Sequence, residues 1–403
     1  MINVAILGFG VVGGGTAEVL KKNHDIIKEK TGADIRIKHI LDLRDFPDSP
    51  FAALIRHDFS EIINDPEVDI VIEAMGGAHP AYDFSKAALE AGKSVVTSNK
   101  LVVAEFGTEL LALARKQGVR YLFEASVGGG IPIIRPIMND LVQNNITAID
   151  GILNGTTNYI LTQMSACGAS FSDALAQAKA NGYAEADPTA DIEGHDAARK
   201  IVILAALAYG KCISPSKIHT EGITKISSED VNLAAKRGYS VKLIGHAEKA
   251  DGKVLAFVAP RLVPAGSPLR DVSDVFNGIL VSCDMLGDAM FYGRGAGKLP
   301  TASAVVSDVV DIASNGASGT FAKWEDAAEN DIFPFEEYSC RRYFRLAGCR
   351  SEIFKAFPDS EEIPSASDEI ALISGKTSEK ETAEICELLA RNGVRVLSHI
   401  RVL

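Results

Sequence analysis

The stretch that decides the fold is INVAILGFGVVGGGTAEVL, residues 2–20. It opens with a short apolar run that is typical of a buried strand. Gly8, Gly10 and Gly13 follow in the spacing G-x-G-x-x-G, and a helical pattern begins directly after them. In this context the spacing predicts a dinucleotide site, because bare backbone N–H groups can approach a pyrophosphate at the start of a helix. A tight turn that only packs the helix on the strand is the alternative interpretation.

Strands and helices alternate from this turn to about residue 126. Such alternation implies right-handed crossovers and a parallel sheet, so the fold class is α/β. The predicted strands are residues 2–8, 35–43, 68–77, 94–99 and 119–126, and the predicted helices are residues 15–30, 80–93 and 107–118.

The composition limits the class of protein. The chain has 403 residues, of which 47% are hydrophobic and 23% charged, which is typical of a soluble globular protein with more than one core. A net charge of −12 argues against nucleic acid or an acidic membrane as a partner, because such binding relies on Lys and Arg. Six cysteines without a C-x-x-C pair and eight scattered histidines indicate neither a disulfide framework nor a transition-metal site. Without a signal peptide or a membrane-spanning apolar run, we predict a cytoplasmic protein.

The end of the second predicted strand bears on the choice of cofactor. Asp42 can accept hydrogen bonds from a ribose diol, which favours NAD(H), whereas Arg44 can pair with a 2′-phosphate, which favours NADP(H). Both residues are present, and we favour NADP(H). A solvated loop is the alternative for both.

Two later strand ends carry polar residues and glycines. Parallel sheets bind ligands at the carboxyl ends of their strands, so these turns are expected to face the nicotinamide. Lys100 follows one strand end and precedes the apolar LVVA, so a side chain that faces the active site is one interpretation and an ordinary surface charge is the other. At the next, Glu124 precedes Gly128, Gly129 and Gly130, where backbone carbonyls can converge on a monovalent cation while Glu124 supplies charge.

After about residue 135 the pattern changes to a strand, the kink NGTTN (154–158) and a helix. Caps at Thr156, Thr157 and Asn158 are one interpretation of the kink, and a polar ligand site is the other. A further helix is predicted at 170–182 with Ser172 as its N-cap. The stretch GYAEADPTADIEGHDAARK (182–200) then places carboxylates from Glu185 to Glu193 on an irregular loop.

Asp196 and Lys200 stand four positions apart, so they meet on one side of a helix. The residues that follow, IVILAALAYG, are apolar on every face, as expected of a helix enclosed by protein. A pair at the mouth of such a helix is partly desolvated, which costs several kcal/mol per ion before compensation. We therefore favour a catalytic or substrate-binding role over a structural ion pair.

Six motifs, in this order, resemble homoserine dehydrogenase and cover most of residues 1 to 320. The stretch from 182 to 200 is the most specific of them. The motifs are GFGVVGGG (8–15), VVTSNK (95–100), FEASVGGGIPII (123–134), GILNGTTNYIL (151–161), GYAEADPTADIEGHDAARK (182–200) and GRGAGKLPTASAVVSDVV (293–310).

The resemblance implies reduction of L-aspartate 4-semialdehyde to L-homoserine with NAD(P)H, on the route to threonine and methionine. It implies that Lys200 is the general acid and Lys100 a second catalytic lysine near the nicotinamide. The substrate-binding residues would be Glu185 and Asp196, supported by Asp191. The cofactor would contact Gly8, Gly10, Val11, Val12, Gly13, Arg44, Lys100 and Gly297, and Na⁺ would lie at Glu124, Val127, Gly129 and Ile131, mostly at backbone carbonyls.

The expected architecture is a Rossmann dinucleotide-binding domain (1–135 plus about 300–325), an α+β catalytic and dimerisation domain (136–299) and a small C-terminal α+β domain (338–403). Residues 314–337 are expected to be a linker. The last domain resembles the ACT regulatory fold, although its first helix near SEIFKAF is short and the usual proline-glycine turn is missing. We expect a homodimer or homotetramer. Inhibition by an amino-acid effector such as threonine is one interpretation of the tail, and a purely structural or dimerising tail is the other. A dehydrogenase of another amino aldehyde and a non-catalytic ACT-bearing nucleotide sensor are the alternative functions.

Overall fold

The computed structural model describes residues 1–320, 322–365 and 368–403, so Phe321 of the expected linker lies outside the described residues. The chain forms two compact units. Unit 1 comprises Met1–Asn145, Val202–Pro215 and Gly293–Asp326, and unit 2 comprises Ile146–Ile201, Ser216–Tyr292 and Ala327–Leu403.

The sheet of unit 1 is the predicted parallel sheet. Its strand order is β3-β2-β1-β4-β5-β6, and every neighbouring pair is parallel. This order, which reverses between β1 and β4, is that of a doubly wound dinucleotide-binding fold. The strands are β1 (Ile2–Leu7), β2 (Ile35–Leu41), β3 (Ile55–Arg56), β4 (Ile70–Glu73), β5 (Ser94–Thr97) and β6 (Tyr121–Leu122). The strand predicted at 119–126 is thus much shorter, because the chain turns into a 3-10 helix at Glu124.

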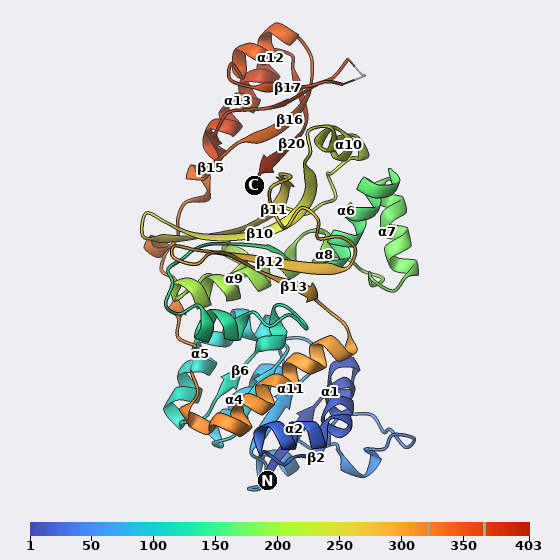
Figure 1. The fold of residues 1–403 in the computed structure, drawn as a ribbon, viewed down its shortest axis with the longest axis vertical. Coiled ribbons are helices and arrows are strands. Elements are labelled where there is room, and N and C mark those ends of the chain that lie inside the picture. Colours follow the sequence, from blue (N-terminus) through green and yellow to red (C-terminus); the bar gives the residue numbers. More distant parts are fainter. Residues whose placement is uncertain (321, 366–367) are drawn as a thin grey trace. The chain divides into compact units, whose positions relative to one another are not determined.

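The helices of unit 1 differ from prediction mainly in their bounds. The helix predicted at 15–30 is two helices, α1 (Val11–Lys22) and α2 (His24–Thr31), which meet at Asn23. Figure 1 shows α11 (Lys298–Asn315) beside α1, and Gly15 permits this approach because a Cβ there would lie 2.9 Å from Lys298 Cγ. The other helices are α3 (Ser60–Ile63), α4 (Ala81–Glu90) and α5 (Lys100–Gln117).

The expected linker is anchored in unit 1 where it is described. Trp324 is buried against Gly107, and its indole Nε1 donates to Thr108 Oγ1 at 3.1 Å. The following strand β14 (Glu325–Asp326) pairs with β8 (Lys211–Cys212). This part of the chain therefore forms part of the core rather than a free connection.

Unit 2 is built on one continuous sheet, of order β13-β12-β7-β10-β11-β20-β16-β18-β17, with β9 pairing β11 beside that path. Small residues such as Gly245 lie where the sheet meets Leu153 and Ile201. The strands are β7 (Ile146–Ile152), β9 (His219–Thr220), β10 (Ser240–Ala250), β11 (Lys253–Val263), β12 (Phe276–Cys283), β13 (Gly287–Arg294), β16 (Arg342–Ala347), β17 (Glu361–Ile363), β18 (Ile370–Ile373) and β20 (Arg395–Val402).

The helices of unit 2 include two with caps other than those predicted. Asn154, not Thr156, Thr157 or Asn158, caps α6, and Ser170, not Ser172, caps α7. In each case the side chain of the cap accepts a backbone N–H three residues on, which is the geometry that selects an N-cap. The helices are α6 (Gly155–Cys167), α7 (Phe171–Ala180), α8 (Thr189–Ile192), α9 (His195–Tyr209), which continues into unit 1, and α10 (Ser228–Lys236).

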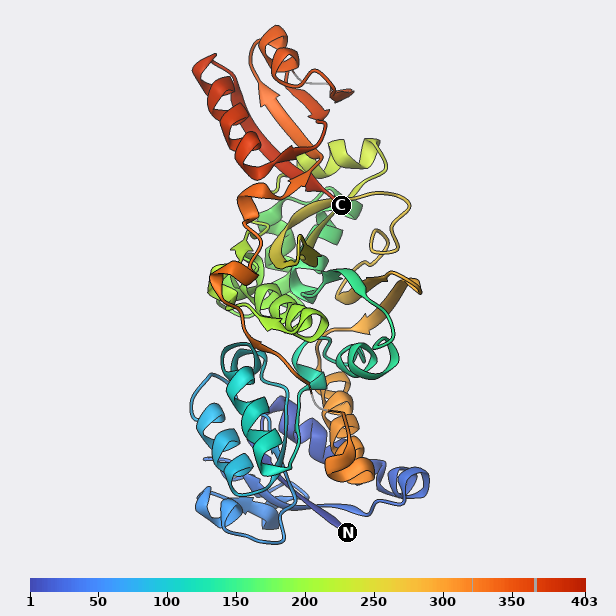
Figure 2. The same ribbon diagram turned by 90° about the vertical axis from the view of Figure 1, so that its left-hand side faces the viewer.

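The C-terminal segment of unit 2 follows the order β16, α12 (Arg350–Ala356), β17, β18, α13 (Glu379–Arg391), β20. Both helices pack on the same face of its strands, through a core that includes Phe344, Ile353 and Leu389 (Figure 2). The last strand, β20, also pairs in parallel with β11, so this segment and the middle of the chain share one sheet.

Candidate functional site

The glycine-rich turn of unit 1 has the close backbone packing that its spacing predicts. Gly8 has a φ of +90°, and a Cβ on Gly13 would lie 1.9 Å from the Gly8 carbonyl oxygen. No side chain fits there, so the start of α1 lies directly against the end of β1. Gly10 is the N-cap of α1, while Val11 is exposed and Val12 is half-buried.

A cavity of about 520 Å³ opens beside this turn. Its lining includes Gly8 and Gly10 of the turn, and Asp42 and Arg44, which follow β2. Backbone amides at a helix start together with a cation suit the phosphates of a dinucleotide. The lining also includes residues that no local pattern marks, among them His57, Phe59, Met75, Pro80 and Phe84.

Asp42 and Arg44 form one hydrogen-bonded pair. Arg44 Nε and Nη2 donate to the Asp42 carboxylate at 3.0 and 3.1 Å, and the Phe9 N–H donates to it at 2.8 Å. The hydrogen bonds from Arg44 and then the Phe9 amide lower the pKa of Asp42 to about 2. The pair of Asp42 and Arg44 is therefore ionised at neutral pH. The ring of His57 lies nearby, and its hydrogen bond with the Asp42 carbonyl oxygen raises the pKa of His57.

In unit 2, the start of α6 and the start of α9 are joined by side-chain hydrogen bonds. Lys200 Nζ donates to Asp196 Oδ2 and to the Leu153 carbonyl oxygen, both at 2.7 Å. The Asn154 side-chain amide donates to Asp191 Oδ1 at 2.7 Å and to Asp196 Oδ2 at 2.9 Å. We refer to Asn154, Asp191, Asp196 and Lys200 as the acidic cluster.

The acidic cluster is mostly removed from solvent. Asp196 is 7% and Lys200 8% exposed, and the residues that follow, Ile201–Ala206, are buried as predicted. Burial raises the pKa of Asp191, against the opposing hydrogen bond from Asn154. Two carboxylates, an ammonium and an amide thus share one partly desolvated site, which is the kind of environment that tunes acids and bases for catalysis.

The predicted substrate residues differ in their placement. Asp191 belongs to the cluster, on the short helix α8 rather than on the wholly irregular loop that the sequence predicted. Glu185 is exposed on the loop after α7, apart from the described hydrogen bonds of the cluster. Asn154 was missed as a cluster member, although an Asn just before a helical pattern is a recognisable N-cap signal.

In the triple-glycine turn of unit 1, the side chain of Glu124 has backbone partners. The Glu124 carboxylate accepts the backbone N–H groups of Ile133, Ile134 and Arg135, at 2.6 to 2.8 Å. These hydrogen bonds fix the carboxylate next to the glycines of the turn. Among residues 1–320, 322–365 and 368–403, the structure contains no group of three or more His, Cys, Asp or Glu side chains that could hold a metal ion.

The glycines of this turn have a packing role. Gly129 has a φ of +58°, and a Cβ there would lie 2.2 Å from the Gly295 carbonyl oxygen. Gly130 similarly faces Pro300. The turn thus packs directly on the segment that contains Gly297, the N-cap of α11.

Lys100 follows the carboxyl end of β5, where the sequence predicted it. It is the first residue of α5, capped by Asn99, and it is half-buried. The apolar residues after it, beginning with Val102 and Val103, are buried in the core.

Comparison with known proteins identifies the family. The sequence model "Homoserine dehydrogenase" matches residues 132–310, and "Homoserine dehydrogenase, NAD binding domain" matches residues 8–124. The homoserine dehydrogenase of Bacillus subtilis is 35% identical, with 99% of this chain and 97% of the relative covered. The chain belongs to the homoserine dehydrogenase family. The enzyme of Neisseria gonorrhoeae is 45% identical over 86% of this chain and 81% of the relative.

Solved homoserine dehydrogenases have the same fold. The crystal structure from Thiobacillus denitrificans matches with a TM-score of 0.92 and 36% identity, over 100% of this chain and 98% of that one. A hyperthermophilic archaeal homoserine dehydrogenase in complex with NADPH matches with a TM-score of 0.66 and 29% identity, over 77% of this chain and 97% of that one.

The family assignment gives the reaction. The protein is a homoserine dehydrogenase, an oxidoreductase that interconverts L-aspartate 4-semialdehyde and L-homoserine with a nicotinamide dinucleotide. This function is preferred over a dehydrogenase of another amino aldehyde and over a non-catalytic sensor. None of the described helices has both the length and the apolar character needed to cross a membrane.

Proposed function

We propose that Lys200 is the general acid of the reduction and that the rest of the acidic cluster orients it. The bound nicotinamide supplies the hydride. As the aldehyde carbon accepts it, negative charge develops on the carbonyl oxygen, and the Lys200 ammonium stabilises that charge and donates its proton. The observation that carries the proposal is the pair of 2.7 Å hydrogen bonds, to Asp196 and Leu153, that hold this ammonium in a buried position.

The carboxylates suit the other end of the substrate. L-Aspartate 4-semialdehyde carries an α-ammonium group, and a cation is bound best by ionised carboxylates in a partly desolvated site. We propose that Glu185 and Asp196 bind the amino and hydroxyl ends of the substrate and that Asp191 supports them. Asn154, which donates to both aspartates, holds the two carboxylates together.

The test is Lys200→Ala, assayed as homoserine oxidation by absorbance at 340 nm. Loss of a general acid-base group should lower kcat by about 10²- to 10⁴-fold. Lys225→Ala is the matched control, because Lys225 is an exposed lysine of the same unit. Activity of Lys200→Ala within tenfold of the parent enzyme would remove Lys200 from the mechanism.

We infer that the enzyme prefers NADP(H) to NAD(H). Arg44 and His57 line the cavity beside the glycine turn, where a guanidinium and an imidazole can donate hydrogen bonds to a 2′-phosphate. The Asp42 carboxylate, which would otherwise accept from a ribose diol, already accepts from Arg44 and Phe9. The archaeal relative binds NADPH.

Cofactor preference is tested by kcat/KM with NADPH and NADH, in the parent and in Arg44→Ser. Loss of one charged hydrogen-bond donor should lower the NADPH-to-NADH ratio about tenfold. An unchanged ratio in Arg44→Ser would show that this guanidinium does not read the 2′-phosphate.

For unit 1 we further propose Lys100 as the second catalytic lysine, Gly297 as a cofactor contact, and a Na⁺ site at the carbonyls of Glu124, Val127, Gly129 and Ile131. The support for the cation site is the tight turn of this segment, in which the Ile131 N–H donates to the Gly128 carbonyl oxygen at 2.9 Å. Replacing NaCl by choline chloride at equal ionic strength should lower the melting temperature if Na⁺ binds the folded protein.

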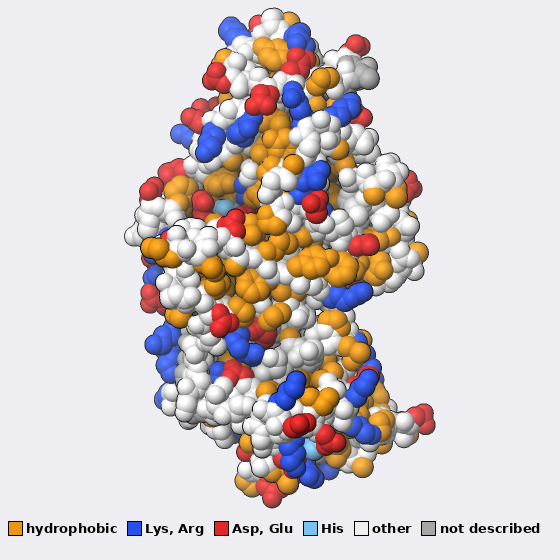
Figure 3. Space-filling model, in the orientation of Figure 1, with side chains coloured by type: hydrophobic (Ala, Val, Ile, Leu, Met, Phe, Trp, Pro, Cys, Tyr) orange, Lys and Arg blue, Asp and Glu red, His pale blue; other side chains and the backbone are white. Residues whose placement is uncertain are grey.

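We propose a homodimer or homotetramer that forms through unit 2. Figure 3 shows hydrophobic side chains gathered over the middle of the face drawn, where β10 to β13 lie in Figure 1. The large exposed hydrophobic residues of β13 and the preceding turn are Met285, Leu286 and Tyr292. Patches of this kind mark interaction surfaces. Light scattering after size exclusion tests the mass.

The C-terminal segment supports the proposal of an ACT-like domain with an amino-acid effector such as threonine. Its order β-α-β-β-α-β and the antiparallel arrangement β20-β16-β18-β17 suit such a domain, although α12 is as short as the sequence suggested. Assays with and without threonine test the effector.

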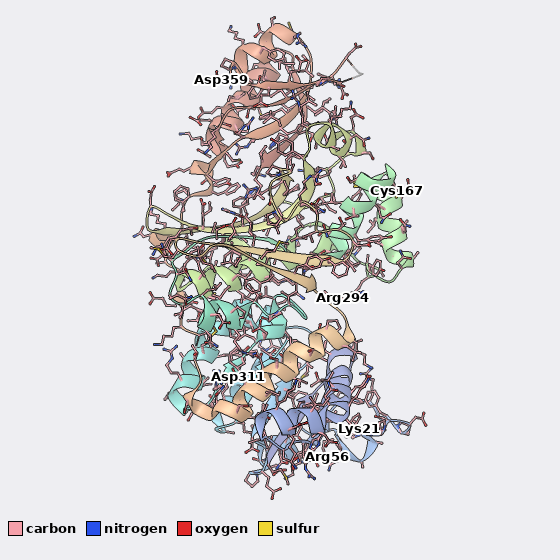
Figure 4. All side chains as sticks on the ribbon, viewed as in Figure 1. Lys21, Arg56, Cys167, Arg294, Asp311 and Asp359 are labelled. Carbon is pink, nitrogen blue, oxygen red and sulfur yellow. The ribbon has the colours of Figure 1, made fainter. Side chains whose placement is uncertain are left out.

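We also propose that the enzyme acts in the cytoplasm, since its six cysteines, among them the exposed Cys167 (Figure 4), are free thiols.

A further inference from the structure

The C-terminal strand β20 carries a buried arginine that links two parts of unit 2. Arg401 is 3% exposed. Its Nε and Nη2 donate to the Glu379 carboxylate at 2.7 and 3.0 Å, and its Nη1 donates to Glu221 Oε2 at 2.7 Å. Arg342 of β16 donates to Glu379 as well. One guanidinium therefore joins the start of α13 to the segment that follows β9.

Burial of an ion pair is by itself weak evidence that stability is its main role. Removing a charge from water costs several kcal/mol, and apolar side chains of similar volume often stabilise a core equally well. What a fork-shaped guanidinium provides is position, because two carboxylates must lie at fixed places to accept from it. The question is what the position of Glu221 controls.

The residues after Glu221 pack on the backbone of the acidic loop, here defined as residues 185–196. Ile223 N–H donates to the Ile192 carbonyl oxygen at 2.8 Å. A Cβ on Gly222 would lie 2.1 Å from that same oxygen and 2.5 Å from Glu193 Cα. The two backbones are thus in direct contact, with no side chain between them that could absorb a shift.

A second contact lies one residue further along the acidic loop. Gly194 has a φ of +86°, and a Cβ there would lie 3.2 Å from Thr220 Cγ2 and 3.3 Å from Val258 Cγ1. The segment 220–223 therefore supports residues 192–194 from Gly222 and from Thr220. Asp191 immediately precedes this supported stretch and Asp196 closely follows it.

We propose that Arg401 and Glu221 are positioning residues for the substrate carboxylates. The ion pair holds Glu221 in place. The next two residues, Gly222 and Ile223, in turn hold the backbone at Ile192. The acidic loop is thereby kept where Asp191 and Asp196 meet Asn154 and Lys200. This inference rests on the proposed roles of the acidic cluster. It makes the last strand of the C-terminal segment part of the support of the substrate site, whether or not that segment binds an effector.

The test uses Glu221→Gln in the full-length enzyme, which keeps the shape of the side chain and removes its charge. Loss of a coupling of this kind should raise the KM for homoserine about tenfold, with a smaller effect on kcat. The KM for the nicotinamide cofactor, whose cavity is lined by unit 1, should stay within twofold. Hydrogen–deuterium exchange should quicken in the peptide that spans residues 185–196.

Two further variants complete the test. Arg401→Lys keeps the cation and should give an intermediate KM, and it serves in place of Glu221→Gln if that variant does not fold. Arg350→Gln is the control, because it breaks an exposed ion pair with Glu362 in the same C-terminal segment and should change neither KM nor exchange in residues 185–196.

The outcomes separate this inference from the proposed function. If Lys200→Ala loses turnover but Glu221→Gln leaves the homoserine KM and the exchange of residues 185–196 unchanged, the positioning role is overturned and the mechanism stands. An equal rise of KM in Arg350→Gln would also overturn it, since the effect would then be general destabilisation. If Lys200→Ala keeps its activity, the mechanism itself fails.

Discussion

The glycine turn of unit 1 and the acidic cluster of unit 2 are built on opposite principles. The turn depends on the absence of a side chain at Gly13, which leaves room for one backbone to lie against another. The cluster depends on polar and charged side chains that hold one another, since Asn154 and Lys200 both donate to Asp196. We therefore expect the turn to be sensitive to an added methyl group at Gly13, and the cluster to a lost charge.

The largest expected effect tests the charge dependence of the cluster. Asp196→Asn removes the carboxylate that accepts from both Asn154 and Lys200. Breaking one side of a buried pair costs about 3–5 kcal/mol, so kcat/KM for homoserine should fall a hundredfold or more. Asp187→Asn is the matched control, since Asp187 is exposed and bonds only locally, to Thr189, among the described contacts. Similar losses in both variants would contradict the distinction.

A smaller effect tests the glycine turn. Gly13→Ala places a Cβ 1.9 Å from the Gly8 carbonyl oxygen, and forcing such overlap costs about 1–3 kcal/mol in stability or cofactor affinity. The neighbouring Gly14 faces open space, so Gly14→Ala should be neutral or stabilise α1 by up to ~1 kcal/mol. Thermal unfolding and cofactor KM would show the contrast. Equal behaviour of the two variants would mean that the turn relaxes around an added methyl group.

The smallest effect concerns pH and the support of the acidic loop. Burial raises the pKa of Glu221. The His219 ring, whose Nε2 lies 3.7 Å from Glu221 Oε2, and the Arg401 guanidinium act in the opposite direction, as does His399. Together they lower the pKa of Glu221 from 4.5 to about 2. As the pH falls, the unfolded chain therefore takes up this proton first, so the stabilisation is complete above about pH 4.5 and is lost toward pH 2.

The measurement is urea unfolding at pH 7 and pH 4. This one group should contribute about 1 kcal/mol to the loss of stability between these values. Glu221→Gln should lose correspondingly less than the parent. A parent and variant with the same pH dependence would show that Glu221 titrates normally in the folded protein.

The same contrast explains what the sequence could predict. The parallel sheet and the glycine turn follow from local patterns, since strand, turn and helix occupy consecutive residues. Asp196 and Lys200 were also found locally, because four positions place them on one side of a helix. Asn154 was missed as their partner because it is 42 residues from Asp196 in the chain, and only the folded sheet brings them together.

Other differences arise where local signals compete. The helix predicted at 15–30 is broken at Asn23, although its polar and apolar pattern continues across the break. Ser170 rather than Ser172 caps α7 because it is the residue whose hydroxyl reaches the Asp173 N–H. The hydrogen bonds of Glu124 could not be predicted locally, because its three backbone donors come from residues 133–135, beyond the turn. On α11 (Figure 4), Asp311 pairs with Arg120, a contact that no local pattern marks.

The cavity beside the glycine turn has consequences for anyone who wishes to re-engineer coenzyme choice. Its lining combines backbone at Gly8 and Gly10 with side chains at Arg44, His57 and Phe84. A Cβ on Gly8 would lie 3.0 Å from the Ala74 carbonyl oxygen at a φ of +90°, whereas a Cβ on Gly10 would meet nothing within 4 Å. Libraries aimed at coenzyme choice can therefore vary Arg44, His57 and Gly10, while Gly8 has to stay glycine.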